Sequence, residues 1–172
     1  RASLFRQLIG RNGDATGKID EFSKRVRDEF GTRVDVAMMK LCYADLTDRS
    51  DPKAIFAHWQ TVMETLEAAY PKVRLVWWTV PVPQPSRLGE KRTEINDLIR
   101  AHVREKRKIL FDIADLECHD LNGRKLLHPG GAERLVEAYA RDQGGHLNDD
   151  GARRAGKAWW YLMARLAGWS PK

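Results

Sequence analysis

Three short apolar runs constrain the fold of this chain more than any other feature. They cover Val34 to Leu41, Val73 to Val80 and Ile109 to Ala114. Their interiors carry few charges, and prolines or charged residues end them, which is typical of strands covered on both faces of a parallel sheet. The sequence therefore predicts three parallel strands at these positions.

The segments around these runs carry apolar residues at helical spacing, which predicts amphipathic helices. The expected helices lie around Ile19 to Phe30, Ile55 to Tyr70, Ile95 to Val103, Ala132 to Tyr139 and Ala152 to Leu166. Asp51 before Pro52 is a typical helix start, Asn148 or Asp149 can cap the last helix, and Gly168 can end it.

Strands that alternate with helices of this length imply right-handed crossovers, so we expect an α/β fold built as a three-layer sandwich. All 172 residues are expected to form a single domain. In such sheets the active site lies at the carboxyl ends of the strands. The loops Cys42 to Asp51, Pro81 to Gly89 and Glu117 to Asn148 are therefore the places to look for chemistry.

Composition narrows the classes of partner. Hydrophobic residues make up 42% of the chain and charged residues 31%, as in an ordinary globular domain. The net charge is +6, but the basic residues are interleaved with acids along helix faces, so no nucleic-acid partner is expected. No apolar run approaches the ~20 residues of a membrane span. The oligomeric state and the compartment, whether cytoplasmic, periplasmic or secreted, stay open.

The two cysteines give no sign of a metal centre. Cys42 and Cys118 each lie in or just after an apolar segment, which suits buried free thiols, although a disulfide between them is conceivable. The chain has no CxxC pair and no His/Cys cluster at zinc spacing. We expect no metal and no organic cofactor.

His146 is the strongest candidate for chemistry. It lies in a glycine-rich loop directly before a helix, and Asp142 stands four residues earlier. The positive end of a helix dipole favours the neutral imidazole that a general base needs, and Gly144 and Gly145 permit a tight turn. The same pattern also fits a surface histidine beside an ordinary helix cap, and the local sequence alone leaves both readings open.

The segment around His146 resembles the C-terminal block of the SGNH (GDSL-like) hydrolases, in which Asp-x-x-His supplies the acid and base of a Ser-His-Asp triad. The run DVAMMKLCYADL is similar to the family's strand that ends in Gly-x-Asn-Asp, with Cys42 to Asp45 in place of that signature. VRLVWWTVPVP and KILFDIADL follow in the family's order. The resemblance covers nearly the whole chain and implies a flavodoxin-like sheet whose first strand lies upstream of Arg1.

The chain departs from the family pattern in three ways. Ala44 stands where the family has its oxyanion asparagine, and Gln143 stands three residues before His146, so Asp142 would be the acid. The serines lie in no Gly-Asp-Ser motif: they are Ser3, Ser23, Ser50, Ser86 and Ser170. The resemblance therefore implies that the nucleophilic serine precedes Arg1 and that these 172 residues alone are inactive on simple esters.

The resemblance implies hydrolysis of an ester of a small molecule or a carbohydrate. His146 and Asp142 would be catalytic, and the backbone of Gly13 would contribute to the oxyanion hole. Tyr43 and Asp45 are candidates for the cleft. The alternative is a non-catalytic binding or scaffold domain that keeps the fold, and Ala44 and Gln143 favour that alternative.

Other residues fit either a site or the core. Trp77-Trp78 and Trp159-Trp160 could stack on sugar rings, but strand alternation and the helix stripe favour core positions for such residues. His119 and His128 lie in the segment that leads to His146, where they could line the cleft or be solvated loop residues.

Overall fold

A computed structural model describes residues 4–170. At its centre is a parallel sheet of β1 (Val36–Met38), β2 (Arg74–Trp78) and β3 (Ile109–Phe111), in that spatial order. Val36 pairs with Arg74, and Val76 pairs with Ile109. The three predicted parallel strands are confirmed, although each is shorter than its apolar run.

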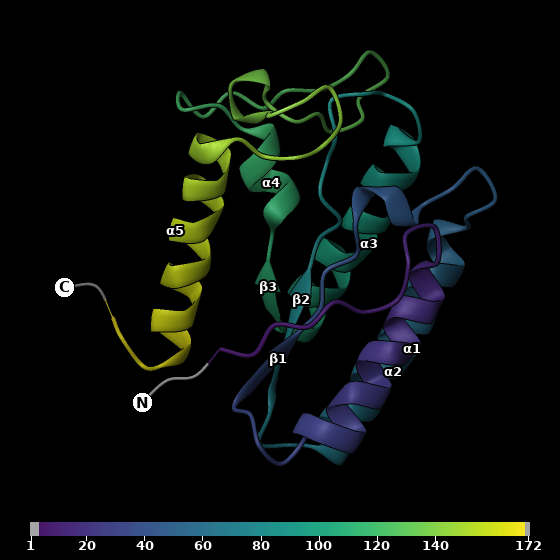
Figure 1. The fold of residues 1–172 in the computed structure, drawn as a ribbon, viewed down its shortest axis with the longest axis vertical. Coiled ribbons are helices and arrows are strands. Elements are labelled where there is room, and N and C mark those ends of the chain that lie inside the picture. Colours follow the sequence, from purple (N-terminus) through teal and green to yellow (C-terminus); the bar gives the residue numbers. More distant parts are fainter. Residues whose placement is uncertain (1–3, 171–172) are drawn as a thin grey trace.

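Helices cover both faces of the sheet (Figure 1). On one face lie α1 (Ala15–Arg25), α2 (Pro52–Ala69) and α3 (Gly89–Lys106), and on the other lies α5 (Asp149–Leu166). The short helix α4 (Ile113–Cys118) follows β3 and contacts α5. The three-layer α/β sandwich expected from the alternation of strands and helices is therefore confirmed.

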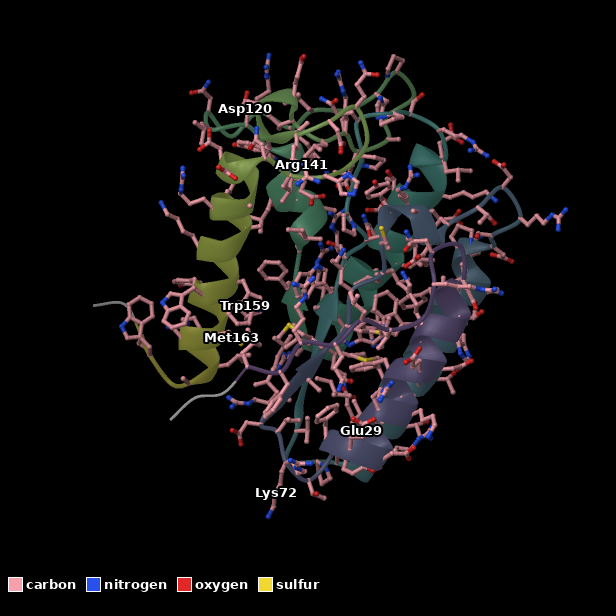
Figure 2. All side chains as sticks on the ribbon, in the orientation of Figure 1. Glu29, Lys72, Asp120, Arg141, Trp159 and Met163 are labelled. Atoms are coloured by element: carbon pink, nitrogen blue, oxygen red, sulfur yellow. The ribbon has the colours of Figure 1, made fainter. Side chains whose placement is uncertain are left out.

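β2 shows why the interiors of the runs carry few charges. Leu75 and Trp77 point into the core formed with α1, α2 and α3, whereas Val76 and Trp78 point into the core formed with α5. Successive strand residues face opposite layers, and both layers here are apolar. Trp159 of α5 packs in this second core, and Figure 2 shows it on the side of α5 that faces the sheet.

The helix ends follow the predicted capping chemistry. The carboxylate of Asp51 accepts hydrogen bonds from the backbone N–H groups of Lys53 and Ala54 at the start of α2. The side chain of Asn148 accepts from Asp150 and Gly151 at the start of α5, at 3.1 and 3.0 Å. These contacts satisfy donors that a helix start leaves free.

Two sequence expectations were wrong in detail. The third run does not remain a strand to Ala114, because the Asp112 side chain accepts from the backbone N–H of Asp115 and starts α4 at Ile113. The helix expected at 132–139 is reduced to a 3-10 turn, η3 (Glu137–Tyr139). The residues before it are extended: Arg134 donates its backbone N–H to Leu126 rather than to its own helix.

The first helix also differs from its predicted form. The stripe from Ile19 to Phe30 continues past α1 as a π-helical turn, η1 (Val26–Phe30). Ile19, Phe22 and Val26 are buried, but Phe30 is only partly buried. A π turn holds more residues than an α turn, so it rotates the residues that follow away from the core face.

Candidate active site

His146 and Asp142 lie in the loop between η3 and α5. Nδ1 of the imidazole is 2.6 Å from Oδ2 of Asp142, and the other carboxylate oxygen accepts the backbone N–H of Gly144 at 2.8 Å. These two hydrogen bonds, the first from His146, lower the pKa of Asp142 below its usual value. The carboxylate is therefore anionic at neutral pH and can orient the ring, which is what an acid partner does for a general base.

The loop that carries His146 is held by backbone contacts to its neighbours. Arg141 donates its backbone N–H to the His146 carbonyl at 2.8 Å, and Gln84 donates to the Gly144 carbonyl at 2.8 Å. Gln84 belongs to the loop that follows β2. Figure 2 shows Arg141 at the end of the molecule where the connecting loops gather.

Tyr43 brings the loop after β1 to the same place. Its ring lies edge-on to the imidazole of His146, with the centroids 5.9 Å apart and the planes at 77°. Gly145 passes directly over the ring: a Cβ added there would lie 2.6 Å from Cε1 of Tyr43 and 3.2 Å from Cβ of Pro83. Loops that follow β1, β2 and β3 thus meet around His146, as expected for the carboxyl ends of parallel strands.

A buried ion pair supports the turn that carries Tyr43. Asp45 lies on the 3-10 turn η2 (Tyr43–Asp45), and its carboxylate receives the Lys18 ammonium at 2.7 and 2.9 Å. The same carboxylate accepts the backbone N–H of Cys42 at 2.7 Å. The side chains of Lys18 and Asp45 are 8% and 0% exposed, so this buried salt bridge links α1 to the turn.

Gly13 lies just before α1 and is tied to this turn indirectly. Its φ of 85° is in the left-handed region, where glycine is favoured. Asn12 beside it accepts a hydrogen bond from Lys18 at 3.1 Å, and Lys18 in turn binds Asp45. The structure gives no direct contact between Gly13 and His146 within residues 4–170, so its role as an oxyanion donor stays a prediction.

Two buried charged residues next to the candidate site could not be found from the sequence pattern. Lys18 stands beside Ile19 in an ordinary helix, and only a buried acid such as Asp45 would reveal that it points inward. Arg92 is also buried, and its Nε donates to the Tyr43 carbonyl at 3.1 Å. From the sequence alone, a charged residue of α3 such as Arg92 is expected to face solvent. Its burial follows from the turn at Tyr43 that packs against it.

The structure gives the remaining candidates other surroundings. Nδ1 of His119 is 2.9 Å from the backbone carbonyl of Asp115, and burial lowers the pKa of His128 below its usual value. Trp77 is fully buried, which confirms its core position, while Trp160 is 71% exposed. Ala44 offers only a methyl group, and Gln143 is exposed on the loop before His146.

Within residues 4–170, one group of side chains has the right types for a metal ion. Ligand atoms of Asp115, Cys118 and His119 lie within 4.8 Å of one another. Nδ1 of His119 is occupied by the Asp115 carbonyl, and burial raises the pKa of the Cys118 thiol to about 12, which opposes the thiolate a metal requires. This group is therefore poorly prepared for a metal.

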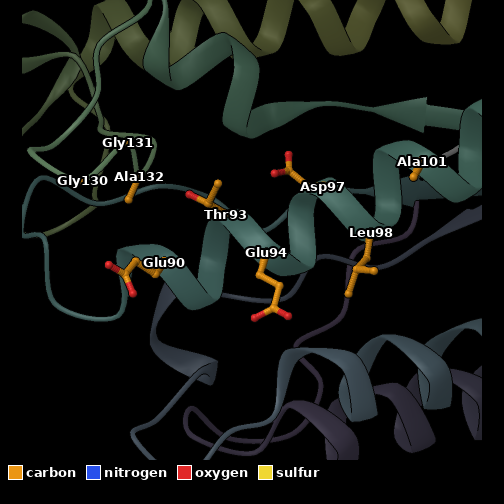
Figure 3. Close-up of a pocket in the computed structure, with 9 residues that line it drawn as sticks. All are labelled: Glu90, Thr93, Glu94, Asp97, Leu98, Ala101, Gly130, Gly131 and Ala132. Atoms are coloured by element: carbon orange, nitrogen blue, oxygen red, sulfur yellow. The ribbon is translucent and has the colours of Figure 1, made fainter.

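A surface groove of about 490 Å³ runs along α3 and does not include His146 (Figure 3). Glu90, Glu94 and Asp97 line it from the helix, and Gly130 and Gly131 close its other side. Its lining includes these three carboxylates and the Thr93 hydroxyl but no histidine or cysteine, and no residue of the His146 cluster. None of the helices within residues 4–170 combines the length and apolar character that a bilayer crossing requires.

Comparison with solved structures identifies the fold. A protein of Desulfitobacterium hafniense assigned to the lipolytic G-D-S-L family matches with a TM-score of 0.61 at 11% identity, over 86% of this chain and 76% of that one. A GDSL-like lipase of Bacteroides thetaiotaomicron matches with a TM-score of 0.62 at 13% identity, over 88% and 72%.

The chain has a GDSL-like hydrolase fold. A carbohydrate esterase of family 3 from Talaromyces cellulolyticus shares this fold, with a TM-score of 0.54 at 16% identity over 86% of this chain and 69% of that one. No protein-family model and no curated protein sequence matches the chain. The similarity to these proteins is therefore one of backbone fold rather than of sequence. The resemblance expected from the sequence is confirmed at the level of the fold.

Proposed function

We propose that this chain carries the base and the acid of a GDSL-like ester hydrolase. The observation that supports this most directly is the 2.6 Å contact between Nδ1 of His146 and the Asp142 carboxylate. It stands at the carboxyl ends of the strands, where active sites of such sheets lie. The fold shared with lipases and a carbohydrate esterase supports an ester as the substrate, of a small molecule or of a sugar.

The mechanism assigns each group one task. A serine upstream of Arg1 attacks the ester carbonyl, and His146 accepts its proton and then returns it to the leaving alcohol. Water then attacks the acyl-serine, with His146 accepting the proton of the water and returning it to the serine as the acid leaves. Asp142 orients the imidazole and stabilises its charged form. The backbone N–H of Gly13 donates to the developing oxyanion. Ala44 supplies no side-chain donor there, so backbone groups have to carry more of this stabilisation.

The surroundings of the four serines that the structure describes support a nucleophile from elsewhere. Ser23 is buried in α1, and Ser50 binds Thr47. Ser86 is exposed in the loop before α3, and Ser170 receives a hydrogen bond from Arg165. In residues 4–170 the imidazole of His146 is paired through Nδ1 with Asp142 and with no serine. Ser3 lies outside the described residues.

The test uses the protein that includes the segment upstream of Arg1. His146→Ala is expected to lower kcat for a p-nitrophenyl ester at least about 10²-fold, as loss of a general base does. The melting temperature should barely change, because the side chain is 57% exposed. Asp142→Asn should lower kcat by up to ~10⁴-fold if the acid is required to orient the base, and by less if Ser and His suffice.

The chain contains a matched control for both variants. His58 and Asp20 form a second exposed His–Asp pair, with Nε2 2.7 Å from Oδ1, on the surface between α1 and α2. His58→Ala and Asp20→Asn should leave kcat unchanged. Full activity in His146→Ala would contradict the proposal and would favour a binding or scaffold domain with the same fold.

A further inference from the structure

We infer that Tyr43 is a positioning residue for His146, an inference that rests on the function proposed above. The imidazole needs more than one contact to be held in a single orientation. It is 57% exposed, and its hydrogen bond to Asp142 fixes only one of its two nitrogens. The second contact is the Tyr43 ring, which meets it edge-on at 5.9 Å and 77°. A T-shaped arrangement of this kind is a preferred geometry for aromatic pairs.

Tyr43 is held firmly enough to position another side chain. Its carbonyl accepts Nε of the buried Arg92 at 3.1 Å. The backbone N–H of Cys42 before it is bound by Asp45 at 2.7 Å, and Asp45 is fixed by Lys18. Burial raises the pKa of the Tyr43 phenol above its usual value, so the ring stays uncharged at neutral pH. The ring thus stands on a fixed turn, whereas His146 stands on an exposed loop.

The two glycines before His146 also lie close to the Tyr43 side chain. A Cβ at Gly145 would lie 2.6 Å from Cε1 and 2.7 Å from Cδ1 of Tyr43, closer than real carbon contacts allow. A Cβ at Gly144 would lie 3.4 Å from the Tyr43 hydroxyl oxygen. The loop therefore crosses the ring at a distance that only glycine at 145 permits. We infer that the ring sets both the path of the loop and the orientation of the imidazole at its end.

The decisive measurement is the protonation pattern of the His146 ring in the 172-residue chain, by ¹⁵N NMR of the imidazole. Because Nδ1 donates to Asp142, the neutral ring is expected to carry its proton mainly on Nδ1. Tyr43→Leu should shift this population toward the Nε2–H form, whereas Tyr43→Phe, which keeps the ring, should preserve it. Tyr161→Leu, at a half-exposed tyrosine of α5, is the control. His146→Gln assigns the signal.

A second pair of variants tests the contact from the loop. Gly145→Ala should disturb the His146 signals as Tyr43→Leu does, because the new methyl group meets the ring. In a Tyr43→Leu background, Gly145→Ala should add less change than it does alone, since its two closest obstacles, Cε1 and Cδ1 of the ring, are gone and only the 3.2 Å approach to Cβ of Pro83 remains. Gly156→Ala is the control, because nothing lies within 4 Å of its added Cβ. Additive effects of the two substitutions would overturn the inference.

In the longer protein with its serine, Tyr43→Leu should lower kcat about tenfold to a hundredfold with KM nearly unchanged. Tyr43→Phe, which keeps the ring, should retain the kcat of the parent protein. The two hypotheses fail separately. Full activity in His146→Ala would remove the proposed function and leave the NMR result to decide whether Tyr43 orients the ring. An unchanged Nδ1–H population in Tyr43→Leu would remove the role of Tyr43 and leave the esterase proposal standing.

Discussion

At the scale of single residues, the most unusual group outside the site is Glu117. It is buried at the end of α4, and its Oε2 accepts the backbone N–H of Val82 at 2.8 Å. Burial raises its pKa to about 8, and the hydrogen bond from Val82 and the charge of Lys40 offset this only in part. In the folded protein this side chain is therefore a neutral acid over most of the neutral range, which is how an isolated carboxyl group tolerates burial.

Glu117 should make stability fall as pH rises. Its folded pKa of about 8 lies above the ordinary value of 4.5, so its stabilisation is complete below pH 4.5 and is lost between pH 4.5 and about 8. The slope of the unfolding free energy from this group can reach about 1.4 kcal/mol per pH unit. Glu117→Gln, which cannot ionise, should flatten this dependence in urea unfolding series at pH 5 to 8.

The exposed Glu137→Gln is the control for this prediction, because it makes the same chemical change without burial. At pH 8 the Glu117→Gln variant should be more stable than the parent chain, and at pH 4.5 the two should be nearly equal. An unchanged slope in Glu117→Gln would mean that the carboxyl group is already ionised in the folded protein.

At the scale of elements, α3 ends in a strained conformation. Arg107 follows its last residue with φ of 52°, and its backbone N–H bonds to the Val103 carbonyl. Residues with a Cβ pay an energetic penalty in this left-handed region, where helices commonly end in glycine. The Arg107 side chain is exposed, so replacing it removes little packing.

Arg107→Gly should therefore raise the unfolding free energy by about 1 kcal/mol, measured by urea unfolding. Arg104→Gly makes the same substitution three residues earlier, inside the exposed face of α3, and should instead lower it by about 1 kcal/mol. Opposite signs for two arginines of one helix would isolate the conformation at residue 107 as the cause. Destabilisation by both variants would contradict it.

For most elements, the sequence predicted whether a segment is a helix or a strand better than it predicted where that element ends. The strands were predicted by their apolar runs and α2 and α5 by their caps, because these signals depend on neighbours in the chain. The end of β3 was misplaced because Asp112 serves as a helix cap, a role visible only once its hydrogen bond to Asp115 is seen. The segment before η3 was misjudged because its partner is the distant Leu126 backbone.

For the candidate site, the sequence identified the two candidate catalytic side chains but not the residues that hold the loops around them. His146 and Asp142 were found from a local pattern, and their contact is 2.6 Å. The Lys18–Asp45 pair and the contact of Gly145 with the Tyr43 ring join residues from different loops and helices. No spacing rule connects such positions, because the fold alone brings them together. The roles of these residues in catalysis stay predictions.

At the scale of the whole molecule, the proposed mechanism predicts that the 172-residue chain alone does not hydrolyse p-nitrophenyl acetate. That mechanism requires a serine from outside residues 4–170, because no serine within them pairs with His146. The assay compares the chain with its longer form under equal conditions. Turnover by the chain itself, lost on replacing one of its five serines, would show that the nucleophile had been misplaced.

The two apolar layers each contain tryptophans of their own. Trp59 and Trp77 are fully buried on the side of α1, α2 and α3, while Trp78 and Trp159 pack on the side of α5. Intrinsic fluorescence of this chain therefore combines signals from both sides of the sheet with those of the exposed Trp160 and Trp169. The difference in emission between the parent chain and a single Trp→Phe variant isolates the tryptophan that was removed, so that loosening of α5 could be seen separately from loosening of the other helices.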